Sequence, residues 1–290
     1  MSLLPSATEI LFAIGAGAEV VGVTHECDFP EAAKTRPHLT RSALPHAASS
    51  AEIDRHVRKS LHEGSSLYDL DSELLERLAP DLIVTQELCA VCAVSYDIVD
   101  TAARRLRGDP RLVSLEPASL EDVFATIAYL GELTAHAEGA AGLLASLRAR
   151  VDALRAHTAD GPRPRTLVLE WTDPPMNAGH WSPGLVELAG AEPLLGNPGA
   201  NSRVLDWDEI EASDPDDIVV GPCGYDLAKT NAAIAELDAV PAWRRLRAVR
   251  DGRVHALDGN QYLNRPGPRL VDTAELIAEA VASSRSRSRT

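Results

Sequence analysis

The stretch that decides the fold is LAPDLIV at residues 78–84, which returns as SDPDDIV at residues 213–219. Each copy follows an acidic amphipathic segment and runs into an apolar, β-branched stretch. Proline and aspartate suit the turn between a helix and a strand, so each copy predicts a helix–turn–strand unit. The two Pro-Asp pairs begin at residues 80 and 215, a separation of 135 in a chain of 290 residues. Repetition at half the chain length favours two similar lobes, although this junction is also common by itself.

The sequence on either side of these copies alternates between strand and helix patterns. Apolar runs predict strands at residues 20–25, 81–85, 112–115, 166–171, 217–221 and 253–257. Helical patterns separate them, while the proline- and serine-rich residues 29–50 predict a loop. Such alternation is typical of parallel sheets covered by helices, and therefore of an α/β fold.

One helical pattern is much longer than the others and lies near the middle of the chain. Its apolar residues keep helical spacing from Leu120 to Leu154, and a single helix of about 40 residues would be nearly 60 Å long. We expect this helix to join the lobes; the alternative is two packed helices broken near Gly139. The predicted divisions are a lobe at 1–117, the helix at 118–160, a lobe at 161–284 and a disordered tail at 285–290.

Composition and charge exclude several classes of protein. The chain has 43 acidic against 28 basic residues and a net charge of −15, which disfavours nucleic-acid binding. Its apolar runs are too short to predict a membrane span. The first residues lack the pattern of a secretory leader, so we expect a cytoplasmic protein, or a periplasmic or cell-surface one if a leader has been removed.

The cysteines share one place in the predicted fold: the segments that follow strands. Ligands of open parallel sheets bind beyond the carboxyl ends of the strands. Four thiolates gathered there could hold Zn²⁺ or an iron–sulfur cluster. The alternative is a set of reduced thiols that line a ligand cleft. The candidate metal ligands are Cys27, Cys89, Cys92 and Cys223.

A second set of side chains in the same segments suits a bulky organic ligand. His180 and Trp181 can stack on a planar molecule, and Arg265, in a stiff Pro-Gly turn, can bind a carboxylate or phosphate. Alternatively, Trp181 fills the lobe core and Arg265 pairs with an acid, and we interpret Trp171 as core. The candidate ligand contacts are His25, Glu87, His180, Trp181, Tyr225, Tyr262 and Arg265. No hydrolase or phosphate-loop signature occurs, so no catalytic residue is predicted.

These motifs also resemble a known family. SLLPSATEIL at residues 2–11, VVGVT at 20–24 and LAPDLIV at 78–84 are similar to the class III solute-binding proteins for cobalamin, haem and iron–siderophores, above all the cobalamin type. The resemblance runs from residue 2 to about residue 280. It implies two Rossmann-like α/β lobes joined by a single long helix, with the ligand in the cleft between them. It also implies an ABC permease as partner. The cysteine set and the absent leader differ from the exported members and indicate a leaderless branch.

Two functions remain open from the sequence. The first is a monomeric, non-catalytic binding protein for a corrinoid such as cobalamin, or a similar metal chelate. The second is a cytoplasmic metal or iron–sulfur protein that uses the four cysteines, either as an enzyme or without catalysis. Iron, sulfide and zinc analysis would separate the second from the first.

Overall fold

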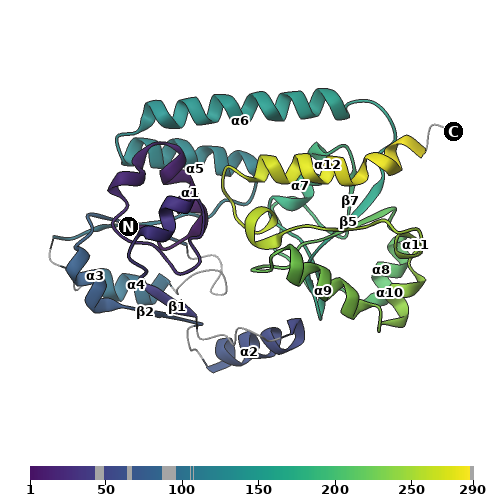
Figure 1. Cartoon of the computed structure of the whole chain (residues 1–290), viewed down its shortest axis with the longest axis horizontal. Coiled ribbons are helices and arrows are strands. Elements are labelled where there is room, and N and C mark those ends of the chain that lie inside the picture. Colours follow the sequence, from purple (N-terminus) through teal and green to yellow (C-terminus); the bar gives the residue numbers. More distant parts are fainter. Residues whose placement is uncertain (43–48, 64–66, 87–95, 105, 107, 288–290) are drawn as a thin grey trace. The chain divides into compact units, whose positions relative to one another are not determined.

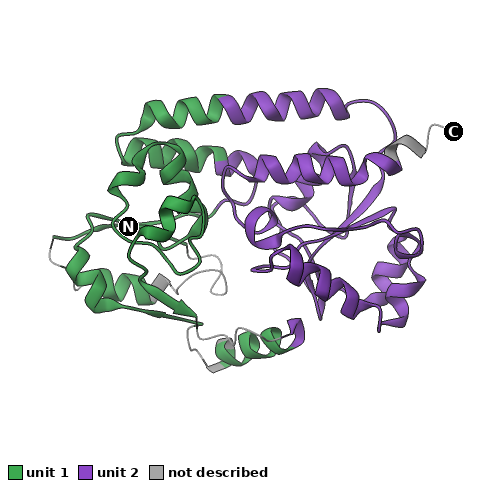
Figure 2. Ribbon diagram, viewed as in Figure 1, with its two compact units in different colours: residues 1–48, 52–116, 124–145 green, residues 49–51, 117–123, 146–290 purple. Residues whose placement is uncertain are grey.

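The computed structural model describes residues 1–42, 49–63, 67–86, 96–104, 106 and 108–287 (Figure 1). By their contacts, the residues form two compact units (Figure 2). Unit 1 comprises residues 1–48, 52–116 and 124–145, and unit 2 comprises residues 49–51, 117–123 and 146–290. Both units combine helices with strands, which confirms the predicted α/β class.

Parallel segments form the centre of unit 1. Strands β3 (Leu82–Thr85) and β4 (Arg111–Ser114) pair in parallel, as the sequence predicts. Residues 1–3 lie beside β3, where Leu3 N–H donates to the Val84 carbonyl (2.8 Å) and Ser2 forms a parallel bridge with Val84. A further short pair, β1 (Thr40–Ser42) and β2 (Tyr68–Leu70), is antiparallel. Strand β1 falls within residues 29–50, which were predicted to be loop.

The expected strand at residues 20–25 is the main difference in unit 1. It is extended and buried at Val23, but it forms only a single parallel bridge, to His38. Ser2 N–H donates to the Gly22 carbonyl on its other side (3.0 Å). Its neighbours on both sides are short, so no ladder builds up even though the sequence has strand character.

The helices of unit 1 cover this layer. They are α1 (Pro5–Ala13), α3 (Ser72–Leu78), α4 (Tyr96–Ala103), most of α2 (Ser50–Glu63) and α5 (Leu120–Leu133), and the first part of α6 (Ala137–Thr158). The core they close around holds, among others, Leu3, Leu39, Leu75, Ile83 and Val99.

The prediction of one long mid-chain helix is wrong, because α5 and α6 are separate helices. Ala135 takes a left-handed conformation (φ 56°) at the end of α5, and His136 N–H donates back to the Gly131 carbonyl (2.7 Å). This pattern ends a helix by turning the chain out of it. The break lies a few residues before Gly139, close to the alternative considered. Both helices cross from one unit to the other, and α6 does so between Ala145 and Ser146.

Unit 2 is built on a single mixed sheet. Strand β5 (Arg165–Thr172) pairs in parallel with β7 (Glu192–Leu194) and β8 (Asp217–Val220), and antiparallel with β6 (Pro175–Asn177). Strand β9 (Val254–Ala256) extends the sheet beside β8 in parallel. The strands predicted at 166–171, 217–221 and 253–257 are thus confirmed, whereas β6 and β7 carry no strand pattern that we recognised.

Helices cover both faces of this sheet. They are α7 (Ser182–Leu188), α8 (Trp207–Ser213), α9 (Leu227–Leu237), α10 (Pro241–Arg245), α11 (Arg247–Arg250) and α12 (Leu270–Arg287). One core contains Leu167, Leu169, Ile218, Val220 and Trp243. Helix α12 continues to Arg287, so residues 285–287 are helical and not part of a disordered tail. No helix among the described residues is both long and apolar enough to cross a bilayer.

The internal repeat is confirmed in the backbone. Helix α3 and strand β3 occupy residues 72–78 and 82–85, and α8 and β8 occupy residues 207–213 and 217–220. The first and last residues of α3 and β3 therefore each lie 135 residues before those of α8 and β8, the same separation as in the sequence motif. Each helix also ends at a left-handed, non-glycine residue, Ala79 (φ 41°) and Asp214 (φ 39°).

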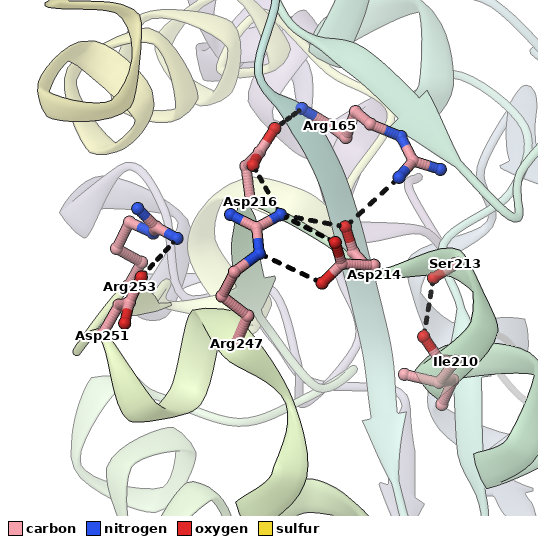
Figure 3. A network of polar contacts seen from close by, with 8 residues as sticks. All are labelled: Arg165, Ile210, Ser213, Asp214, Asp216, Arg247, Asp251 and Arg253. Carbon is pink, nitrogen blue, oxygen red and sulfur yellow. Dashed lines mark hydrogen bonds and ion pairs between the residues drawn. The ribbon is translucent and has the colours of Figure 1, made fainter. Parts of the chain in front are cut away.

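A charged network holds the second copy of this turn to the start of β5 (Figure 3). The Asp216 carboxylate accepts hydrogen bonds from the Arg165 backbone N–H and the Arg247 guanidinium, both at 2.8 Å. Arg247 also pairs with Asp214 (3.1 Å). Burial raises the pKa of Asp216, but the hydrogen bonds from Arg165 and Arg247 outweigh it and hold the pKa below its ordinary value.

Replacing Asp216 with asparagine should lower the free energy of unfolding by about 1–2 kcal/mol at pH 7, because charge-assisted hydrogen bonds are lost. Since folding lowers this pKa, the stabilisation is present above the unfolded-state pKa of about 3.9 and is lost as the pH falls through the folded-state value. Urea unfolding at pH 7 and pH 3 should therefore show a difference between wild type and D216N that shrinks in acid. Asp238→Asn, at an exposed position, is the control; an undiminished D216N effect at pH 3 would contradict this explanation.

Candidate functional site

The carboxyl ends of β5, β8 and β9 meet in unit 2, which is where an open parallel sheet binds ligands. Cys223, after β8, donates its backbone N–H to the Glu170 carbonyl of β5 (3.2 Å). Asn260, after β9, donates its backbone N–H to the Tyr225 carbonyl (3.0 Å). Segments that are far apart in the sequence are thus tied into one surface. We call these tied strand ends the strand-end surface.

A short π-type helical turn, η3 (Gly259–Leu263), forms one part of this surface. A Cβ added at Gly259 would overlap the backbone of Gly221 and Pro222, so only glycine allows this close approach. Asp258 stabilises the turn by accepting the Gln261 N–H (2.7 Å), and Asn264 Nδ2 donates to the Gly221 carbonyl (2.9 Å). Irregular π-turns of this kind are frequent at functional sites.

Aromatic rings give the strand-end surface its apolar character. Trp171 and Tyr225 pack edge to face, with ring centroids 5.4 Å apart. Trp181 Nε1–H donates to the Leu263 carbonyl of η3 (2.9 Å), and the His180 ring lies 5.5 Å from that of Trp181. The Arg269 guanidinium lies over the Tyr262 ring at 5.6 Å. Such rings suit the face of a large planar molecule.

The hydroxyl groups of Ser50, Thr172 and Tyr225 lie close together at the edge of the Trp171–Tyr225 pair. Ser50 Oγ lies 2.9 Å from Thr172 Oγ1 and 3.2 Å from the Tyr225 hydroxyl. Ser50, Thr172 and Tyr225 are all buried. Burial raises the pKa of Tyr225, and the hydrogen bond with Ser50 offsets part of that rise. The phenol therefore stays protonated near neutral pH and can donate a hydrogen bond.

Arg265 is buried in the same surface. Its Nη2 donates to Asn260 Oδ1 (2.7 Å), and its side chain belongs to a residue that is 6% exposed. The arginine therefore supports Asn260 and η3.

His180 has an unusual backbone. Its φ of 50° is left-handed, and its N–H and carbonyl pair with Ala200 (2.7 Å) and Gly199 (2.9 Å). Within the described residues, the buried Nε2 of His180 has no hydrogen-bond partner. A strained residue with an unused imidazole nitrogen is typical of functional sites.

Residues 1–260 match the family described as periplasmic binding protein. The chain belongs to that family. It is 24% identical over 286 residues to a cobalamin-binding protein of Halobacterium salinarum, and the match covers 97% of this chain and 68% of the relative.

Solved structures share the fold of this chain. A periplasmic vitamin B12 binding protein of Vibrio cholerae gives a TM-score of 0.69 at 20% identity, over 97% of this chain and 95% of that chain. A periplasmic heme-binding protein from Roseiflexus sp. RS-1 gives a TM-score of 0.70 at 23% identity, over 96% and 97%. The resemblance inferred from the sequence motifs is confirmed at the level of the family and the fold.

The other predicted site residues of this chain lie in unit 1 or outside the described residues. His25 Nδ1 lies 2.6 Å from Thr40 Oγ1, and its ring is 5.5 Å from that of Tyr68. Cys27 is buried, with its thiol 3.1 Å from Thr8 Oγ1 and 3.2 Å from Thr24 Oγ1. Glu87, Cys89 and Cys92 lie outside the described residues.

The cysteine set stays a prediction, because two of its four members lie outside the described residues. Cys223 is exposed in unit 2, whereas the Cys27 thiol is enclosed by hydroxyl groups in unit 1. Across the described part of the chain, no three His, Cys, Asp or Glu side chains come together as metal ligands.

Sequence reasoning missed three members of the strand-end surface. Trp171 was interpreted as core, yet it is only partly buried and contacts Tyr225. Thr172 is the last residue of β5, and a search that included the final strand residue would have found it. Ser50 carries no local signal, because its partners are more than 120 residues away.

Proposed function

We propose that this chain is the binding component for a corrinoid of the cobalamin class, which it delivers to an ABC permease. The observation that carries the proposal is the strand-end surface, where Trp171, Tyr225 and Trp181 gather with hydroxyl and amide groups. A corrinoid combines a broad ring with many carboxamide side chains. Aromatic rings can bind the corrinoid ring. Tyr225, Asn260 and Arg265 can form hydrogen bonds with the carboxamide side chains.

The names of the relatives support this ligand class over other metal chelates. The curated relative is a cobalamin-binding protein, while the solved structures include both B12- and heme-binding proteins. The alternative of a metal or iron–sulfur protein lacks a comparable cluster of side chains in the described residues. Iron, sulfide and zinc analysis of the purified protein is the direct test of that alternative.

The proposal predicts specific binding of cyanocobalamin, measured by isothermal titration and by co-elution of the red ligand in gel filtration. Trp171→Ala should weaken binding about tenfold, because a contact ring is lost, whereas Trp171→Phe should retain most of the affinity. Hemin and a ferric hydroxamate serve as competitors. Folded wild-type protein that binds none of them would contradict the proposal, and preference for hemin would reassign the ligand class.

A further inference from the structure

Thr40, the first residue of β1, holds the ring of His25 within unit 1. The His25 backbone N–H donates to Thr40 Oγ1 (3.1 Å), and His25 Nδ1 lies 2.6 Å from the same oxygen. Thr40 is only 3% exposed. The His25 ring also lies 5.5 Å from the ring of Tyr68, at a tilt of 48°. Tyr68 belongs to β2, so both strands of the β1–β2 pair contact this imidazole.

The hydrogen bonds of Thr40 decide which nitrogen of the neutral His25 ring carries the proton. A backbone N–H can only donate, so Oγ1 accepts it and still has its own proton to place. Within the described residues, His25 Nδ1 is the only other hydrogen-bond partner of Oγ1. A buried hydroxyl proton without an acceptor is costly, so Oγ1 donates to Nδ1 and the ring proton lies on Nε2. The Glu26 carboxylate, 4.0 Å from Nε2, favours a proton there as well.

His136 has the opposite arrangement in the same unit. Its Nδ1 also lies 2.6 Å from an oxygen, but this oxygen is the backbone carbonyl of Thr134. A carbonyl can only accept, so the neutral His136 ring carries its proton on Nδ1. The two Nδ1 contacts have the same length and opposite roles, which makes His136 an internal reference for His25.

We propose that Thr40 is a positioning residue, which presents His25 as an Nε2–H donor to amide carbonyl oxygens of a ligand. The His25 side chain is 25% exposed, so part of it is accessible. Because Nδ1 accepts from Thr40 and Nε2 carries the proton, the neutral ring keeps no lone pair for a metal ion. His25 therefore binds the organic periphery of a chelate and not its metal. Only this role toward a ligand rests on the proposed corrinoid function.

The tautomer can be measured without any ligand. At pH 9 a histidine of ordinary pKa, about 6.5, is neutral. Nuclear magnetic resonance of protein labelled with nitrogen-15 then distinguishes the tautomers by the couplings between ring protons and ring nitrogens. His25 should show the Nε2–H pattern and His136 the Nδ1–H pattern, each assigned by its loss in His25→Gln or His136→Gln. An Nδ1–H pattern at His25 would overturn the role of Thr40.

Two substitutions at Thr40 separate its hydroxyl from its packing. Thr40→Val keeps the shape of the side chain but removes the donor, so the Nδ1 resonance of His25 should shift and the Nδ1–H form should become detectable. Thr40→Ser keeps the hydroxyl and should keep the wild-type pattern. A T40V spectrum with the wild-type tautomer and an unshifted Nδ1 resonance would show that Thr40 does not position the ring.

Cyanocobalamin tests the donor role. His25→Ala should weaken binding about threefold to tenfold, the range expected for one net hydrogen bond. His25→Gln should lose less, because its amide can place a donor near the position of Nε2. His136→Ala is the matched control and should bind as wild type does. Unchanged affinity in H25A would overturn the donor role.

Aquocobalamin tests whether His25 reaches the metal, since an imidazole that replaces its bound water changes the visible spectrum. The spectrum of the bound ligand should be the same in wild type and in H25A. A difference between the two would mean that His25 coordinates the metal, against the proposal. If neither cobalamin binds, the corrinoid function and the donor role toward it both fail, while the resonance patterns still decide whether Thr40 sets the tautomer.

Discussion

Replacing His255 with alanine should lower the free energy of unfolding of unit 2 by about 3 kcal/mol, because a fully buried carboxylate would lose its partner. Asp217, at the start of β8, is 0% exposed, and its Oδ1 lies 3.0 Å from His255 Nε2 on β9. The other oxygen, Oδ2, has no partner among the described residues. Tryptophan emission during urea unfolding measures the effect, since all four tryptophans lie in unit 2.

The double variant Asp217→Val/His255→Val separates the charge from the packing. Valine suits a buried strand, and removing both polar partners leaves no carboxylate to solvate. The double variant should therefore be more stable than H255A. If the two are equally destabilised, loss of packing and not an orphaned carboxylate explains the H255A effect.

Gly139→Ala should destabilise unit 1 by about 3 kcal/mol, at the upper end of typical overpacking costs. A Cβ at Gly139 would overlap the backbone carbonyl of Ile14, which immediately follows α1. Backbone cannot rotate away as a flexible side chain can, so α1 or α6 has to shift. Hydrogen exchange of the α1 amides, together with circular dichroism during urea unfolding, would measure the loss.

Gly142→Ala is the matched control in the same helix. An added Cβ there meets nothing within 4 Å. Alanine favours the helical conformation over glycine by up to about 1 kcal/mol, so this variant should be as stable as wild type or more so. Equal losses in G139A and G142A would mean that helix α6, not the contact with Ile14, responds to the substitution.

Local patterns in the sequence predicted five of the nine strands in the described residues, namely β3, β4, β5, β8 and β9. The runs at residues 81–85 and 217–221 are β-branched and bounded by Pro-Asp turns, and both form strands. The run at residues 20–25 has the same character but gains only one bridge. The number of ladder bonds that a strand forms depends on the length of its neighbours, which its own sequence does not contain.

The break between α5 and α6 illustrates a second limit. Large apolar residues keep helical spacing on both sides of Thr134–His136, so the periodicity indicates one helix. Gly131 allows α5 and α6 to pack closely, because a Cβ added there would lie only 2.5 Å from the Cβ of Ala140 in α6. That requirement is visible only once the two helices pack together.

The candidate site was predictable where it follows the strand-end rule. Tyr225, Tyr262 and Arg265 follow β8 and β9, and hydrogen bonds or ring contacts tie each of them into the strand-end surface. Ser50 was not predictable, because a long-range hydroxyl contact has no periodicity or spacing to reveal it. Trp171 is partly buried, so the structure places it between the core position that the sequence predicts and a fully exposed one.

The left-handed residues at Ala79 and Asp214 have an evolutionary consequence. Left-handed backbone costs roughly 1–2 kcal/mol for a residue other than glycine, and glycine at either position would remove that cost. The same unfavourable geometry at both ends of a 135-residue interval is expected if an ancestral gene of half this length was duplicated and fused.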